Sequence, residues 1–189
     1  SGQNFWGGPT YVRNQGYVEL LNCGSQIPLN IPRISESSSA IRVCQQLQWC
    51  TSKSERWLEE CRTWRVTPGP FADSYALDMR FELRNVSGML LRLGSPTTEG
   101  RPAAGYGGLF WRGATSFIGG QVSDSDGRSE AEMIMGRRAR WLAFTSKQQD
   151  ACERSTLVFL YHPRNPRYPT QWFVRSNKCA MVSFAFSFD

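Results

Sequence analysis

A stretch near the C-terminus gathers the side chains that are best suited to chemistry. Residues 162–175, HPRNPRYPTQWFVR, contain the only histidine of the chain, three prolines, three arginines, an asparagine and a tryptophan. Prolines at a spacing of three forbid a helix and remove donors from any strand ladder, so the sequence predicts a stiff, irregular loop here. Such a loop can hold cations, an imidazole and an indole around a ligand.

The side chains of this loop and of a second motif, GLFWRG at 108–113, suit an anionic or sugar-like ligand. A guanidinium forms bidentate bonds to a carboxylate or to neighbouring hydroxyls, and an indole offers the flat apolar face on which a sugar ring stacks. The alternatives are ion pairs with nearby acids for the arginines, core packing for the indoles of Trp111 and Trp172, and turn formation for the asparagine. The predicted ligand-binding residues are Arg112, Arg164, Asn165, Trp172 and Arg175.

Composition limits the classes of function. The chain has 189 residues, 40% apolar and 20% charged, and a net charge of +6 that comes almost entirely from arginine. The basic residues do not cluster as in nucleic-acid-binding proteins, apart from the short run at 137–140. No apolar run reaches the length of a membrane span, and residues 1–8 lack the features of a signal peptide. We therefore expect a cytoplasmic protein that binds neither nucleic acid nor membranes.

Metal and cofactor motifs are weak. Six cysteines are spread along the chain without a CxxC pair, and one histidine cannot complete a typical zinc site. We expect buried free thiols, with a disulfide among Cys44, Cys50 and Cys61 as the alternative. The sequence DSDG at 124–127 resembles the start of a calcium loop but lacks its final glutamate. No phosphate or dinucleotide fingerprint occurs, so we expect neither a metal nor a cofactor.

Alternation of apolar and polar residues predicts many strands and no convincing helix. The clearest case is 75–83, where apolar residues at every second position indicate a strand with one wet face. Residues 24–39 and 97–104 are expected to be loops, and 24–39 the most mobile. The predicted strands are 17–21, 41–49, 57–66, 75–83, 89–93, 115–122, 139–145, 155–161, 172–174 and 180–188. Residues 57–66 are ambiguous, because Trp57, Cys61 and Trp64 also fit helical spacing, and we favour a strand there.

Many short strands at regular spacing predict an all-β fold, an antiparallel β-sandwich formed by one domain over residues 1–189. The final strand runs directly to Asp189, and the chain opens within a turn beside an aromatic residue. We therefore also consider that these residues are a fragment of a longer domain.

Five motifs of the chain resemble one family of bacterial proteins. In order they are NFWGGPTYV, ERWLEECRTWRV, AGYGGLFWRG, GRRARWLAF and LYHPRNPRYPTQWFVR, and the likeness covers most of residues 4–186. They resemble the family known as methane oxygenase PmoA-like, a domain of unknown function. The resemblance implies a β-rich domain similar to the galactose mutarotase-like supersandwich, or part of one, and an association with sugar-modifying proteins. Members usually carry flanking segments on both sides that are absent from these residues.

The resemblance also implies where an acid–base pair could lie. A mutarotase-like reaction needs a general acid and a general base on either side of a sugar ring, usually a carboxylate and a histidine. His162 is the only histidine, and Glu132 resembles the acidic position before the glycine–basic–basic stretch of the family. The alternatives are that His162 caps a strand end, and that Glu130, Asp78 or Glu82 supplies the carboxylate.

Three functions therefore remain open from the sequence. The first is a sugar epimerase, mutarotase or related carbohydrate-processing enzyme that uses His162 and Glu132 as catalytic residues. The second is a non-catalytic module that binds a glycan or an anionic small molecule through its arginines. The third is a structural part of a larger assembly. The sequence does not decide whether the chain self-associates.

Overall fold

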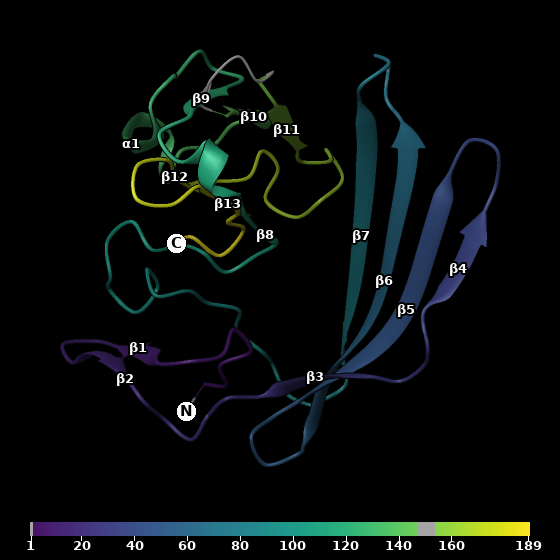
Figure 1. Cartoon of the computed structure of the whole chain (residues 1–189). Coiled ribbons are helices and arrows are strands. Elements are labelled where there is room, and N and C mark those ends of the chain that lie inside the picture. Colours follow the sequence, from purple (N-terminus) through teal and green to yellow (C-terminus); the bar gives the residue numbers. More distant parts are fainter. Residues whose placement is uncertain (1, 147–153) are drawn as a thin grey trace. The chain divides into compact units, whose positions relative to one another are not determined.

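The chain forms an almost entirely β structure. The computed structural model describes residues 2–146 and 154–189, and Figure 1 shows the arrangement of their strands. The strands are β1 (Thr10–Val12), β2 (Gly16–Val18), β3 (Ser25–Pro28), β4 (Arg33–Glu36), β5 (Ile41–Cys50), β6 (Arg56–Pro68), β7 (Tyr75–Asn85), β8 (Phe110–Arg112), β9 (Gln121–Asp124), β10 (Trp141–Thr145), β11 (Thr156–Leu160), β12 (Trp172–Arg175) and β13 (Met181–Phe184). One short 3₁₀ turn, η1 (Thr115–Phe117), and one short helix, α1 (Ala131–Ile134), accompany them.

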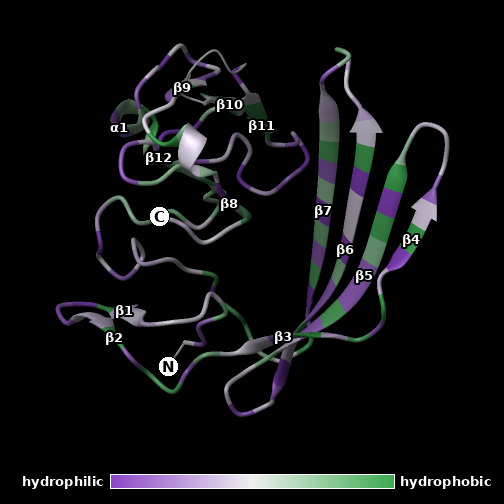
Figure 2. Cartoon of the chain, in the orientation of Figure 1, coloured by the Kyte–Doolittle hydropathy of each residue, from purple (hydrophilic) through white to green (hydrophobic). Residues whose placement is uncertain are grey.

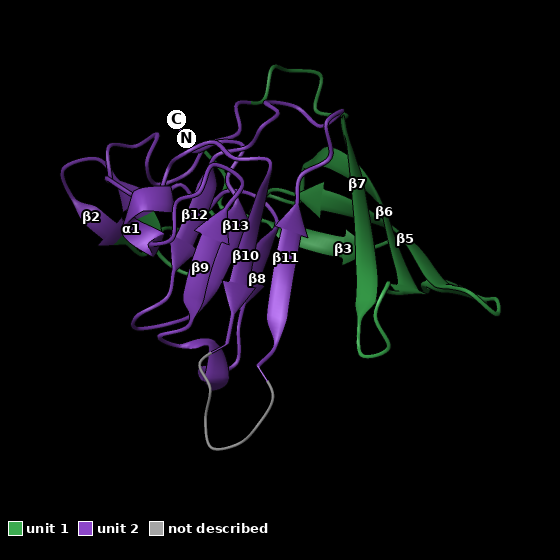
Figure 3. Ribbon diagram, turned by 90° about the horizontal axis from the view of Figure 1, so that it is seen from above, with its two compact units in different colours: residues 1–10, 18–91 green, residues 11–17, 92–189 purple. Residues whose placement is uncertain are grey.

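Contacts between Cα atoms divide the chain into two compact units, which Figure 3 shows in different colours. Unit 1 comprises residues 1–10 and 18–91, and unit 2 comprises residues 11–17 and 92–189. The prediction of one domain over residues 1–189 stays a prediction. Each unit is described by itself below.

Unit 1 is an antiparallel sheet with the strand order β3-β5-β6-β7, in which β4 also pairs with β5. The three long strands are joined in sequence, and Ile41, Val66 and Leu77 are opposite one another across β5, β6 and β7. Opposed residues in an antiparallel sheet point to the same face. One face therefore carries the apolar side chains of alternate residues, and the other carries mainly charged ones. Figure 2 shows this alternation as bands of opposite hydropathy along the strands.

Unit 2 is a small β-sandwich. Its two three-stranded sheets have the orders β11-β10-β9 and β12-β13-β8, and every pairing is antiparallel. The inner faces of both sheets contribute to one core, in which Leu142 and Phe144 of the first sheet pack with Trp172, Val174 and Val182 of the second. The prediction of an antiparallel all-β sandwich is confirmed.

Several local predictions were wrong. Residues 24–39 are not one loop, because β3 and β4 pair in register with β5 and so extend the sheet. Residues 89–93 alternate but form no strand, since they pair with no strand among the described residues. Residues 115–122 begin as a 3₁₀ turn, and β9 starts only at Gln121. Helix α1 was missed because four residues are too few to show a helical period.

The cysteines are free but mostly not buried. Of the five described, Cys50 alone is buried, whereas Cys23 and Cys61 are exposed. The thiol of Cys61 is exposed because this residue lies on the charged face of the unit 1 sheet, opposite Glu82 of β7. Cys152 lies outside the described residues. No helix among the described residues is long and apolar enough to cross a membrane.

Candidate functional site

The proline loop after β11 is held by bonds from side chains to its backbone. Tyr161 donates its hydroxyl to the carbonyl of Pro166 at 2.8 Å, and burial raises the pKa of this phenol. One guanidinium nitrogen of Arg138 donates to the carbonyls of Arg167 and Pro169, at 3.0 and 2.8 Å. The loop is irregular, as the spacing of its prolines predicts, and these three bonds attach it to the rest of unit 2.

Two of the predicted site residues shape the start of this loop. The Nδ1 atom of His162 accepts a hydrogen bond from the backbone N–H of Arg164 at 3.2 Å, and its carbonyl accepts one from Asn165 at 2.9 Å. This arrangement matches the alternative in which His162 and Asn165 form a turn at a strand end. All three side chains are exposed. Within the described residues, the guanidinium of Arg164 has no ion pair.

Trp172 does not face a ligand, which corrects its assignment as a stacking platform. Its side chain is fully buried in the core of unit 2, and its indole N–H donates to the carbonyl of Ala139 at 3.0 Å. Its ring packs against Phe184, with 4.8 Å between ring centres. The indole therefore stabilises the sandwich and has no free face.

His162 and Glu132 are not brought together. His162 follows β11, one edge of the sheet β11-β10-β9, whereas α1, which carries Glu132, contacts β12 of the second sheet as well as β9 at the other edge of the first. Two inter-strand spacings separate these edges, or about 10 Å. The carboxylate of Glu132 is exposed and accepts a long bond from Asn177 at 3.5 Å. Neither group has a contact with the other.

Arg112 and Arg175, by contrast, share one sheet face. Arg175 of β12 is opposite Met181 of β13, and Met181 is opposite Arg112 of β8. Directly opposed residues point to the same face, so the two guanidinium groups flank one methionine across about 10 Å of sheet. Both arginines are exposed, and neither has an ion pair within the described residues. We call Arg112, Met181 and Arg175 the arginine face.

Aromatic rings continue this face along the strands. The guanidinium carbon of Arg175 lies 5.1 Å from the ring centre of Phe173, which is a cation–π distance. Phe173 packs edge-on against Tyr106, with 5.2 Å between the ring centres. Between the strands, the hydroxyl of Ser183 is buried and has no hydrogen-bond partner in the described part of the chain. The arginine face thus combines two guanidinium groups with the aromatic rings of Phe173 and Tyr106.

A polar cluster near this face escaped prediction. Tyr17 and Tyr106 share a short hydrogen bond between their hydroxyls, and Arg101 donates to the hydroxyl of Tyr106 at 3.2 Å. Burial, together with the hydrogen bond to Tyr17, raises the pKa of Tyr106 to about 12. Arg101 and Tyr106 are five residues apart, but Tyr17 comes from a distant segment, so no local spacing in the sequence could have revealed the whole cluster.

The DSDG motif is an internal ion-pair site. Asp124 is buried, and its carboxylate accepts bonds from the backbone of Asp126 and Arg128 and from the Arg128 guanidinium, the last at 2.6 Å. Burial by itself would lower the pKa of Arg128, but its bonds to the two acids raise it overall. The carboxylate is therefore already saturated by donors from its own turn.

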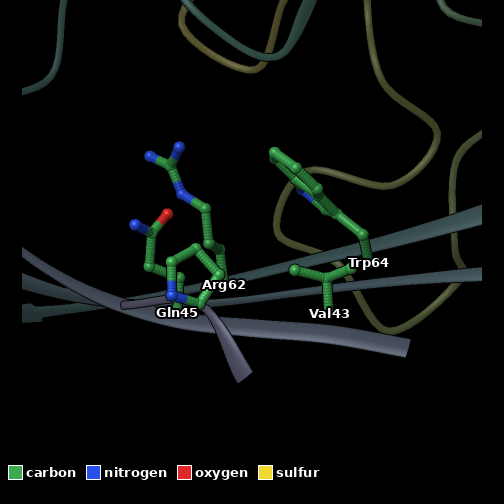
Figure 4. A pocket seen from close by; sticks show the side chains of 5 residues that line it. Val43, Gln45, Arg62 and Trp64 are labelled. Carbon is green, nitrogen blue, oxygen red and sulfur yellow. The ribbon is translucent and has the colours of Figure 1, made fainter. Parts of the chain in front are cut away.

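Two hollows lie on unit 1. One hollow lies between Val43, Gln45, Arg62, Trp64 and Pro32, and Figure 4 shows its side chains standing on one side of the sheet. Its volume of about 20 Å³ holds a single water. A wider opening of about 330 Å³ lies beside the serine turn at 37–39, and it is lined by these serines together with Ala40, Ile41, Val66, Thr67, Pro68 and Tyr75.

These features describe an all-β protein whose second unit presents a cationic face over aromatic rings. A family model described as "Family of unknown function (DUF6807)" matches residues 1–189, and the chain belongs to this family. No curated protein and no solved structure matches the chain.

Proposed function

We propose that unit 2 is a binding module for an anionic small molecule, with a carboxylate-bearing sugar as the ligand class. The observation that carries the proposal is the arginine face, where Arg112 and Arg175 flank Met181 in register and lack acidic partners in the described chain. Guanidinium groups that have no acid of their own are available for a ligand carboxylate, which they bind bidentately.

The surroundings of the face support a ring-shaped ligand. The guanidinium of Arg175 lies over the ring of Phe173. Because this contact already orders the guanidinium, less conformational entropy is lost when a ligand binds. Met181 provides an apolar surface between the two cations. The resemblance to PmoA-like proteins, and through them to sugar-modifying proteins, supports a sugar rather than another anion. A cytosolic location is part of this proposal, and free thiols agree with a reducing compartment.

The geometry favours binding over epimerisation. An acid–base pair must reach both sides of one sugar ring, and His162 follows β11 whereas Glu132 lies on α1, beside β9 and β12, with no hydrogen bond between the two in the described chain. His162 also has its Nδ1 atom engaged by the backbone of its own loop. Binding requires only the arginine face, whose parts already lie together.

Titration calorimetry with galacturonate and glucuronate oligomers tests the proposal. We expect saturable binding that weakens about ten- to a hundredfold in Arg112→Ala and in Arg175→Ala, since each removes charged hydrogen bonds. Arg175→Lys keeps the charge but loses the planar fork, so it should restore only part of the affinity.

The matched controls separate recognition from general charge. Arg33→Ala, on β4 of unit 1, removes an equal charge from an exposed strand and should leave binding unchanged. The corresponding neutral oligosaccharides should bind more weakly than the uronates. Wild-type binding that survives in both Arg112→Ala and Arg175→Ala, or equal loss in Arg33→Ala, would refute the assignment. Proton NMR of the sugar pool should show no new epimer signals.

A further inference from the structure

Strand β7 is a long and open edge of the unit 1 sheet. It spans Tyr75–Asn85 and pairs with β6 on one side, and no strand among the described residues pairs with its other side. Ten of its eleven residues are exposed, and Phe81 is half-buried. An exposed edge of this length presents a row of unpaired backbone donors and acceptors, which is a template for another strand.

The charges of β7 make this edge complementary to itself. On one face the strand carries Asp78, Arg80, Glu82 and Arg84, so that the sign alternates at every position. When two identical strands pair antiparallel about a two-fold axis perpendicular to the sheet, each face stays on its own side. The register alone then decides whether like or unlike charges are opposed.

One register opposes unlike charges throughout. With Phe81 opposite its own copy, Arg80 faces Glu82 and Asp78 faces Arg84, and each pair occurs twice because of the symmetry. A two-fold at Arg80 instead places Arg80 against itself and Asp78 against Glu82, which is repulsive. A two-fold at Met79 pairs Asp78 with Arg80 but places Glu82 against Ala76. The register centred on Phe81 therefore forms the most favourable pairs.

The other face and the existing ion pairs agree with this register. Met79 faces Leu83 across the axis, and these side chains are 37% and 43% exposed, so pairing shields apolar surface that is open in the single chain. Arg80 already contacts Glu82 of its own strand, and Arg84 already donates to Glu59 of β6. Each guanidinium has five donors, so a second carboxylate can be added.

We propose that the partner for this edge is a second copy of the same chain, paired antiparallel along β7 with Phe81 opposite Phe81. The two sheets then form one continuous sheet across the two-fold axis. The interface uses only residues of unit 1 and is independent of the arginine face.

Sedimentation equilibrium of charge-reversed variants tests both the dimer and its register. Arg80→Glu and Glu82→Arg each turn two attractive contacts into repulsive ones, and we expect each to raise the dimer dissociation constant about tenfold or more. The double variant R80E/E82R exchanges the partners and should return to within about threefold of wild type. In the Met79 register the same double variant opposes Asp78 to a carboxylate, so restoration identifies the Phe81 register.

Two further measurements keep the test decisive. Glu99→Arg makes the same charge change on an exposed turn of unit 2 and should not alter the dissociation constant. Hydrogen exchange of the β7 amides should slow with rising protein concentration in the wild type and not in Glu82→Arg, while circular dichroism confirms that both are folded. A wild-type chain that stays monomeric at about 100 µM, or a double variant as weak as the singles, overturns the proposal.

Discussion

A buried ion pair in the unit 1 sheet provides the sharpest test of how this fold is stabilised. Glu60 of β6 is 3% exposed, and its two carboxylate oxygens accept bonds from Arg62 at 2.6 and 2.9 Å. The indole N–H of Trp49 on β5 donates to the same carboxylate at 2.7 Å. Arg62 also donates to Gln26 of β3 at 3.2 Å. The network thus joins three strands through one buried charge.

The expected cost of breaking the pair depends on which partner is removed. Arg62→Leu leaves a buried carboxylate with only the indole donor, a loss of about 3–5 kcal/mol for a fully buried pair. The side chain of Arg62 is 20% exposed, so water can reach the edge of the site, and we expect a value near the lower end. Glu60→Leu should cost about 1–2 kcal/mol, because the arginine can turn to solvent while the indole N–H loses its acceptor.

The double variant isolates the interaction. With both charges replaced by leucine no buried ion remains, and we expect a loss of about 1–2 kcal/mol, smaller than that of Arg62→Leu. Urea unfolding followed by tryptophan fluorescence gives the free energy of unfolding for the wild type, both single variants and the double variant. The coupling free energy of the cycle should be about 3 kcal/mol.

A matched control uses an exposed pair in the same sheet. Arg84 bonds Glu59, and this bond lowers the pKa of the Glu59 carboxyl, but both groups are accessible to water. Arg84→Leu should therefore leave the free energy of unfolding close to that of wild type. If Arg62→Leu costs no more than Arg84→Leu, then the Glu60 carboxylate is hydrated and the reasoning from burial is wrong.

Three other predictions concern unit 2. Burial, and then the hydrogen bond to Tyr17, raise the pKa of the Tyr106 phenol to about 12. The neutral phenol therefore stabilises the fold below pH 10, and this stabilisation is lost as the pH rises through 12. After allowance for its partial exposure, roughly 1 kcal/mol of unfolding free energy should disappear over that range in wild type but not in Tyr106→Phe, as measured by urea titration. Asp124→Asn removes the charge that a buried carboxylate shares with Arg128, and should lower the free energy of unfolding by about 2–3 kcal/mol; an unchanged value would show that the turn does not need the ion pair. Gly108→Ala places a Cβ 1.9 Å from the carbonyl oxygen of Phe184, and thermal unfolding should show a loss of about 2–3 kcal/mol of unfolding free energy. Gly2→Ala adds its Cβ in open space and should match wild type in the same measurement.

The long strands could be predicted because their signal is local. Apolar residues at every second position from Tyr75 to Leu83 reflect a pleated strand with two unlike faces, and β7 is observed there. The same rule failed at residues 89–93, where alternation occurs without a partner strand. Alternation shows that a segment suits a sheet, but it does not show that a neighbouring strand is present.

The exposure of single side chains depended on which layer covers each face. Trp172 and Arg175 lie three residues apart in one strand, and on sequence both could face a ligand. In the sandwich Trp172 points into the core between the sheets, whereas Arg175 points to the opposite face. Successive residues of a strand point to opposite faces of the sheet, and only the packing of the second sheet decides which of these faces is buried.

The sequence by itself therefore determined the all-β class, the strands long enough to show their period, and the irregular course of the proline loop. The tertiary structure decided which distant residues meet. It placed Arg112 and Arg175 on one face, either side of strand β13, and it placed His162 after β11 and Glu132 on α1, which contacts β9 and β12. The physical reason is that alternation and turn chemistry act between neighbours in the chain. Strand order is set by long-range pairing, which no local spacing encodes.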